Sequence, residues 1–213
     1  MQKELLLFQK LAEKLIKAEK QEPIITPIPP KELFNILPLA LEEEPADDAF
    51  FENALEKLVL NTPRTATNLF FNQLFGGRNP KATLGDLLAV LLNNSMYTYK
   101  VAGPQVGIEK EILRKSCDLI GYGKDADGTF APGGSMSNFM AILMARDAHN
   151  DNIKNEGVLQ KMTAYTSIES HYSTSKNAAF IGIGREQVRY VATNEFGQMD
   201  PKNLSVKIAE DIA

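Results

Sequence analysis

Hydrophobic and polar positions follow a helical period over the first part of the chain. Up to about residue 120, apolar side chains recur every three or four positions, which is typical of amphipathic helices. At the N-terminus this face collects Leu5, Phe8, Leu11 or Ala12, Leu15 and Ile16. The pattern predicts helices at the N-terminus, over 47–60, from residue 84 and around Cys117.

The pattern changes after residue 120. Short apolar segments at 162–167 and 187–193 read as strands, and helical patterns cover 138–149, about 171–180 and the residues from Pro201. Strands that alternate with helices in units of this length indicate a parallel or mostly parallel sheet. The sequence therefore predicts an α/β fold in this part of the chain.

The two patterns divide the chain into two predicted domains. A helical N-terminal segment over 1–82, with a Pro-rich extended connector at 22–30, leads into an α/β domain over 83–213. The last helix stays amphipathic to the final residues and meets no stop signal. We therefore expect the α/β domain to be incomplete in this chain and to continue in a longer protein.

Composition narrows the classes of partner. The chain of 213 residues has 23 Lys plus Arg against 27 Asp plus Glu, with no basic stripe, so nucleic acid is not expected. No stretch approaches the ~18 apolar residues of a membrane span. Two histidines and one cysteine argue against a metal site. Charges recur throughout the N-terminal segment, which is unlike a signal peptide, so the reducing cytoplasm is the expected compartment.

The segment Gly133–Asn138, "GGSMSN", stands where a helix is predicted to begin. The first amides of a helix lack internal partners, and the helix dipole makes that end slightly positive. Glycines allow close approach and serine hydroxyls add donors, which favours an anion. Three interpretations compete: a tight turn capped by Ser135 or Ser137, a nucleotide site, and a serine nucleophile.

Two of these interpretations fail at particular positions. Neither the phosphate-loop pattern G-x-x-x-x-G-K-[ST] nor a complete G-x-G-x-x-G occurs in the chain. The nucleophile pattern G-x-S-x-G needs glycine where Ser137 stands. A capped turn and a site for a single phosphate group both remain open.

A second segment, "SHYSTSKNAAFIGIG" at 170–184, follows the next predicted strand. In a parallel sheet it opens at the same carboxyl edge as the Gly-rich turn, with His171 at the start of a helix. Taken alone, His171 also fits an ordinary surface histidine.

These two segments, in this order, resemble the pyridoxal-phosphate-dependent amino-acid decarboxylases of the glutamate, cysteine-sulfinate and aspartate decarboxylase group. "DGTFAPGGSMSNFMAILMARD" looks like the phosphate-loop segment of that family, and "SHYSTSKNAAFIGIG" looks like its ring-stacking histidine segment. Residues 67–77 and 93–103 are similar to further family segments. The resemblance covers about residue 33 to the end and implies the fold type I architecture and a homodimer with active sites between subunits.

The resemblance implies that pyridoxal phosphate is the cofactor and that backbone amides and the Ser137 hydroxyl hold its phosphate. The residues assigned to this cradle are Gly134, Ser135, Met136, Ser137 and Asn138. Asn138 would support the turn.

The resemblance also implies that His171 stacks on the pyridine ring and orients the substrate carboxylate. Gln73 and Phe75 would reach the substrate from a loop near the subunit interface.

Two features limit what the resemblance implies. The family's cofactor-binding lysine follows a histidine, and the chain has no His-Lys pair, so we expect an active full-length enzyme and an inactive isolated chain. Lys100, and Gly103 followed by Pro104, depart from the usual family residues beside the active-site entrance. A non-catalytic interaction module of the same fold is the alternative.

Phe75 lies in "FNQLF", which is nearer the cysteine-sulfinate and aspartate branch than the glutamate branch. The expected reaction is therefore α-decarboxylation of a small acidic amino acid, namely cysteine sulfinate, aspartate or glutamate. Diaminobutyrate and aromatic amino acids stay open.

Overall fold

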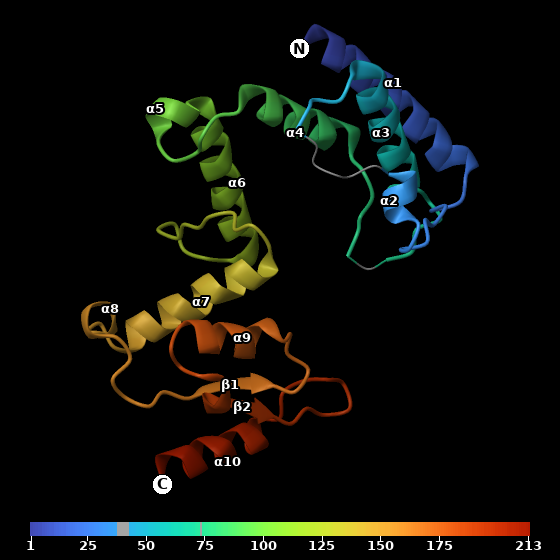
Figure 1. Cartoon of the computed structure of the whole chain (residues 1–213). Coiled ribbons are helices and arrows are strands. Elements are labelled where there is room, and N and C mark those ends of the chain that lie inside the picture. The colour runs from blue at the N-terminus through green and yellow to red at the C-terminus, as the bar shows by residue number, and fades with distance from the viewer. Residues whose placement is uncertain (38–42, 73) are drawn as a thin grey trace. The chain divides into compact units, whose positions relative to one another are not determined.

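The computed structural model describes residues 1–37, 43–72 and 74–213. These residues form two compact units, Met1–Ser95 and Met96–Ala213 (Figure 1). The predicted domain division between residues 82 and 83 stays a prediction.

The first unit is helical, as the apolar period predicts. Its elements are α1 (Gln2–Gln21), α2 (Leu33–Ile36), α3 (Asp48–Asn61) and α4 (Pro80–Leu92). Side chains fix where two of them begin: Asp47 accepts the N–H of Phe50 at 2.7 Å, and Asn79 accepts the N–H of Lys81 at 3.0 Å. Such caps satisfy amides that have no partner inside the helix. Because of the Asn79 cap, α4 begins at Pro80 rather than at residue 84.

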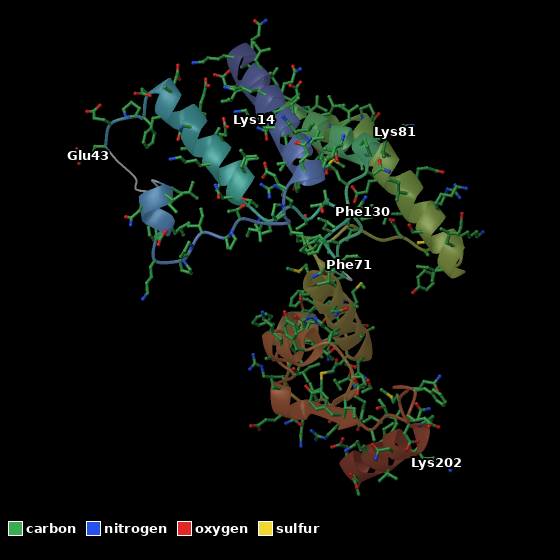
Figure 2. All side chains as sticks on the ribbon, turned by 90° about the vertical axis from the view of Figure 1, so that its right-hand side faces the viewer. Lys14, Glu43, Phe71, Lys81, Phe130 and Lys202 are labelled. Atoms are coloured by element: carbon green, nitrogen blue, oxygen red, sulfur yellow. The ribbon has the colours of Figure 1, made fainter. Side chains whose placement is uncertain are left out.

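Charged pairs line the contact between α1 and α3. Lys14 Nζ lies 2.5 Å from Glu56 Oε1, Lys10 pairs with Glu52, and Lys3 pairs with Asp48. Figure 2 shows Lys14 on α1. The paired residues are seven and four positions apart on α1 and four apart on α3, so each set lies along one face of its helix and the pairs align the two helices.

Arg64 fastens the extended connector to the end of α3. Its guanidinium donates to the Pro23 carbonyl at 2.6 Å, to Glu22 Oε2 at 2.7 Å and to the Leu60 carbonyl at 2.8 Å. Arg64 is 3% exposed. One buried side chain thus holds the start of the Pro-rich segment against the end of α3, where the loop that carries Phe75 begins.

The second unit has the predicted alternation of helices and strands. Its elements are α5 (Tyr99–Ala102), α6 (Pro104–Ile120), α7 (Gly134–His149), α8 (Ile153–Glu156), β1 (Ala164–Ser167), α9 (Ser173–Phe180), the short 3-10 helix η1 (Arg185–Gln187), β2 (Val188–Val191) and α10 (Pro201–Ile212). Strands β1 and β2 pair in parallel, from Ala164 opposite Val188 to Ser167 opposite Val191. The predicted α/β fold with a parallel sheet is confirmed.

Helices cover both sides of the two strands. Figure 1 shows α9 on one side of β1 and β2 and α10 on the other, with α7 beside α9. The core between them contains Val191, Ala178 and Ile181, which are 0%, 1% and 4% exposed. This packing places the start of α9 and the start of α7 together.

Asp211 joins α10 to the sheet. Its carboxylate accepts the Tyr165 hydroxyl at 2.8 Å and the Arg189 guanidinium at 2.7 Å. The hydrogen bond from Arg189 first, and that from Tyr165 second, lower the pKa of Asp211 below its ordinary value. The Asp200 side chain caps the other end of α10 by accepting the Lys202 N–H at 2.9 Å.

Helix α7 begins four residues earlier than predicted. The apolar pattern indicates a start at residue 138, whereas the helix starts at Gly134. The reason is that Gly133 takes φ 113° and ψ 157°, a conformation that favours glycine and turns the chain directly into the helix. Ser135, Met136 and Ser137 therefore lie in the first turn, and Asn138 follows directly after it.

The described ranges contain neither a membrane-spanning helix nor a cluster of metal-binding side chains. No helix in them is both long and apolar enough to cross a lipid bilayer. No group of three or more His, Cys, Asp or Glu residues in those same ranges is placed to hold a metal ion.

Candidate functional site

The N-terminus of α7 has no side-chain cap. Its cap residue is Gly133, and no side chain accepts a hydrogen bond from the first turn. The interpretation of the Gly-rich segment as a turn capped by Ser135 or Ser137 is therefore wrong. Met136 N–H and Ser137 N–H both point to the Gly133 carbonyl, at 3.0 and 3.2 Å. The N–H groups of Gly134 and Ser135 precede these bonds, so the helix itself offers them no carbonyl partner.

The space in front of this turn is open. A Cβ atom built on Gly133 or Gly134 meets nothing within 4 Å. The Ser137 hydroxyl lies 3.4 Å from the Gly133 carbonyl, and Met136 is 43% exposed. A helix of 16 residues stands behind the turn. Amides, a hydroxyl and a helix dipole thus converge on open space, an arrangement that suits an anionic group.

His171 lies between the end of β1 and the start of α9. One hydroxyl bond and one backbone bond stabilise the turn before it: Thr166 Oγ1 donates to Ser170 Oγ at 2.5 Å, and the Ser170 N–H donates to the Ser167 carbonyl at 3.0 Å. The His171 ring is exposed and packs on Tyr172, with 4.2 Å between ring centroids and 38° between their planes. A parallel strand therefore delivers the histidine at its carboxyl end, as predicted.

Two asparagines join the His171 segment to the first turn of α7. Asn138 Nδ2 donates to Ser173 Oγ at 2.8 Å, and that oxygen lies 2.8 Å from His171 Nδ1. In the opposite direction, Asn177 Nδ2 donates to the Ser135 carbonyl at 3.0 Å. The structure thus brings the Gly-rich turn and His171 into one hydrogen-bonded site.

Ser173 and Asn177 are site residues that the sequence reasoning missed. They are 0% and 3% exposed, and each bridges α9 to α7. One signal was available, because asparagine is unfavourable inside a helix and a buried one needs partners. Their partners lie 35 and 42 positions away, however, and local patterns do not show such distances.

The two predicted substrate residues belong to the first unit. Gln73 lies outside the described residues. Phe75 is 54% exposed and meets Phe70 edge-on, with 5.6 Å between ring centroids. It lines a hollow of about 330 Å³ that also includes Thr65, Arg78 and Asp86. Phe71, labelled in Figure 2, is 91% exposed and leaves this loop with an open apolar surface.

Comparison with known proteins identifies the family. The family model described as "Pyridoxal-dependent decarboxylase conserved domain" matches residues 30–213. The chain belongs to the pyridoxal-dependent decarboxylase family. This confirms the resemblance carried by the Gly-rich and His171 segments.

Two relatives of this decarboxylase-family chain are named for the amino acids that they decarboxylate. It is 38% identical over 181 residues to the cysteine sulfinic acid decarboxylase of Homo sapiens, covering 84% of this chain and 36% of the relative. The acidic amino acid decarboxylase GADL1 of Bos taurus is 35% identical over 184 residues, covering 85% and 35%. The chain therefore spans about a third of the length of these relatives.

Solved structures agree on the fold. The crystal structure of mouse CSAD superposes with a TM-score of 0.90 and 33% identity, over 96% of this chain and 44% of that one. The arrangement of α7, α9, β1 and β2 is thus that of the decarboxylase fold.

The residues of this site fit pyridoxal phosphate. A phosphate group needs several N–H and O–H donors and space to approach them, and the uncapped first turn of α7 offers both. A flat aromatic ring needs a planar partner, and the exposed His171 imidazole is tied to the same turn.

Proposed function

We propose that the full-length protein is a pyridoxal-phosphate-dependent decarboxylase of a small acidic amino acid. The observation that carries the proposal is the pair of hydrogen-bonded bridges between the first turn of α7 and the His171 segment. The names of the relatives support the substrate class.

Each part of the site has a distinct task in this proposal. The amides of Gly134 and Ser135, with the Ser137 hydroxyl, bind the cofactor phosphate, and the α7 dipole favours its negative charge. Asn138 holds the His171 segment against this turn. When bound, the cofactor supplies an electron sink for the charge left as carbon dioxide departs.

His171 positions the reacting groups. The exposed His171 ring would stack on the bound cofactor and orient the substrate carboxylate. By the family resemblance, Gln73 and Phe75 would contact the rest of the substrate. Holding reactants in one orientation is a large part of catalysis in such sites.

We also propose a homodimer. None of the described residues of α4 is buried, and Leu84, Leu88 and Leu91 are 57%, 49% and 54% exposed. Apolar surface of this kind on a helix favours contact with another chain. The cytoplasmic location stays a prediction from the sequence.

The test is a substrate panel with the full-length protein. With pyridoxal phosphate present, we expect carbon dioxide release from cysteine sulfinate, aspartate or glutamate, with kcat/KM at least ~10-fold above that for diaminobutyrate or aromatic amino acids. Release of carbon dioxide from none of them would reject the decarboxylase proposal. A preference for a basic or aromatic substrate would reject only the substrate class.

A further inference from the structure

The hydrogen bonds around His171 specify which ring nitrogen carries the proton. Nδ1 has two neighbours, the Ser173 N–H with its nitrogen at 3.2 Å and the Ser173 Oγ at 2.8 Å. A backbone N–H can only donate, so Nδ1 accepts this bond. In a neutral imidazole one nitrogen accepts and the other carries hydrogen. The neutral ring therefore carries its hydrogen on Nε2.

Asn138 sets the direction of the Ser173 hydroxyl. Its Nδ2 donates to Ser173 Oγ at 2.8 Å and occupies a lone pair of that oxygen. The hydroxyl hydrogen is then free to point at His171 Nδ1, which makes a second donor to the same nitrogen. Ser173 is 0% exposed, so bulk water does not compete for the hydroxyl.

We infer that Ser173 is a positioning residue that holds His171 by Nδ1 and presents an Nε2–H donor at the open edge of the site. Asn138 couples this arrangement to the first turn of α7. His171 is exposed although Ser173 beside it is buried, and no residue in the described ranges bonds Nε2. One side of the ring is thus fixed by the protein and the other is left for a ligand.

The chemical use of this arrangement rests on the proposed function. A substrate carboxylate needs a donor that fixes its direction. The carboxylate loses its charge as carbon dioxide forms, so a full positive charge beside it would stabilise the substrate more than the transition state. A neutral Nε2–H donor orients the carboxylate with less of this penalty.

Imidazole nitrogen shifts measure the inference directly. In the ¹⁵N-histidine-labelled chain, under mildly alkaline conditions where histidine is ordinarily neutral, nitrogens with and without hydrogen have well-separated chemical shifts. His149 is the internal control, because it is the only other histidine and is exposed. For His171 we expect two well-separated ¹⁵N shifts, one for Nε2 with hydrogen and one for Nδ1 without it. For His149 we expect two similar shifts, averaged over both tautomers.

Three variants separate a specific role from a structural one. Ser173→Ala should move the His171 shifts toward those of His149. In Asn138→Asp the new carboxylate accepts the hydroxyl hydrogen, so His171 Nδ1 keeps only the Ser173 N–H as a donor and its shift should move part of the way toward the averaged value of His149. Asn177→Ala is the matched control: it removes the other bridge between α9 and α7 and should leave the His171 shifts unchanged.

Two results would overturn the inference. One is averaged shifts for His171 in the unmodified chain, and the other is an Asn177→Ala change as large as that of Ser173→Ala. If Ser173→Ala does not fold, Asn138→Asp still decides, because unchanged shifts in that variant contradict the role of the hydroxyl.

Kinetics of the full-length protein form a separate arm. Ser173→Ala should lower kcat about tenfold, which equals about 1.4 kcal/mol, with little change in KM. An unchanged kcat would contradict the positioning role. If the shifts behave as expected and the unmodified protein releases no carbon dioxide, the proposed function fails while the Nε2–H assignment holds.

Discussion

At the scale of single residues, we expect the Ser137 hydroxyl to strengthen phosphate binding at the first turn of α7. In the full-length protein, Ser137→Ala should weaken pyridoxal phosphate binding by roughly 1.5–3 kcal/mol, the range for one charge-assisted hydrogen bond. An absorbance titration measures the affinity. Ser205→Ala is the matched control, because Ser205 Oγ likewise donates to the carbonyl four residues earlier, at 2.9 Å in α10. Equal affinities in both variants would remove Ser137 from the site.

His171 should matter more during the reaction than in substrate binding. His171→Ala is expected to lower kcat more than it raises KM, because orientation of the carboxylate stabilises the transition state more than the bound substrate. His171→Phe keeps a planar ring and loses the nitrogen atoms, so steady-state rates of the two variants separate ring packing from hydrogen bonding. A normal kcat in His171→Ala would leave His171 as an ordinary surface residue.

Sequence patterns predicted which residues occupy this site better than they predicted how those residues interact. His171 and the Gly-rich turn could be found because each belongs to a local pattern with a chemical meaning. The bond from Asn138 to Ser173 could not, because it joins residues 35 positions apart and depends on the packing of α7 against α9. Side-chain partners of this kind are set by tertiary structure.

At the scale of elements, Arg64 should stabilise the first unit. Arg64→Met keeps the apolar stem and loses three hydrogen bonds, leaving the Pro23 and Leu60 carbonyls without this donor. We expect the free energy of unfolding to fall by about 2–3 kcal/mol in urea titrations. Glu22→Gln is the control: its side chain is 51% exposed, so the loss should stay below ~1 kcal/mol. Equal losses in both variants would assign the effect to the ion pair alone.

The attachment of α10 should depend on acid pH. Arg189 and Tyr165 hold the pKa of Asp211 below its ordinary value of 3.8. The carboxylate therefore contributes its full stabilisation above about 3.8, and this is lost as the pH falls through the lower folded value. Hydrogen-exchange protection of α10, corrected for intrinsic rates, should fall over this interval.

Asp211→Asn provides the comparison for α10, since a carboxamide does not ionise in this range. Its α10 protection should be lower at neutral pH and show no step on acidification. A step of the same size in the variant would show that another group controls the attachment.

The boundaries of elements show where sequence reasoning reaches its limit. The apolar period placed the end of α7 correctly at residue 149 and its start at 138 instead of Gly134. Glycine and serine are weak helix formers, so the segment reads as a turn. Its helical geometry follows from the conformation of Gly133 and from the Asn177 bond to Ser135, which propensity does not include.

At the scale of the whole molecule, we expect this chain to bind pyridoxal phosphate weakly and without a covalent bond. The α7 turn and His171 are present, but no lysine follows a histidine. Borohydride treatment with the cofactor, followed by peptide mass analysis, should find no stoichiometric modification. Modification of one specific lysine, such as Lys176 near the Phe180 ring, would contradict this.

The hydrogen bonds that join the two halves of the site connect residues that are close in sequence. The two bridges between α7 and α9 connect residues 35 and 42 positions apart, and β1 pairs with β2 from Ala164 to Val188. Short closures cost little chain entropy and form early. During translation, the phosphate-binding turn and His171 can therefore meet as soon as β2 has left the ribosome. Under the proposed function, the nascent chain would then carry its cofactor-binding turn in folded form before its synthesis is complete.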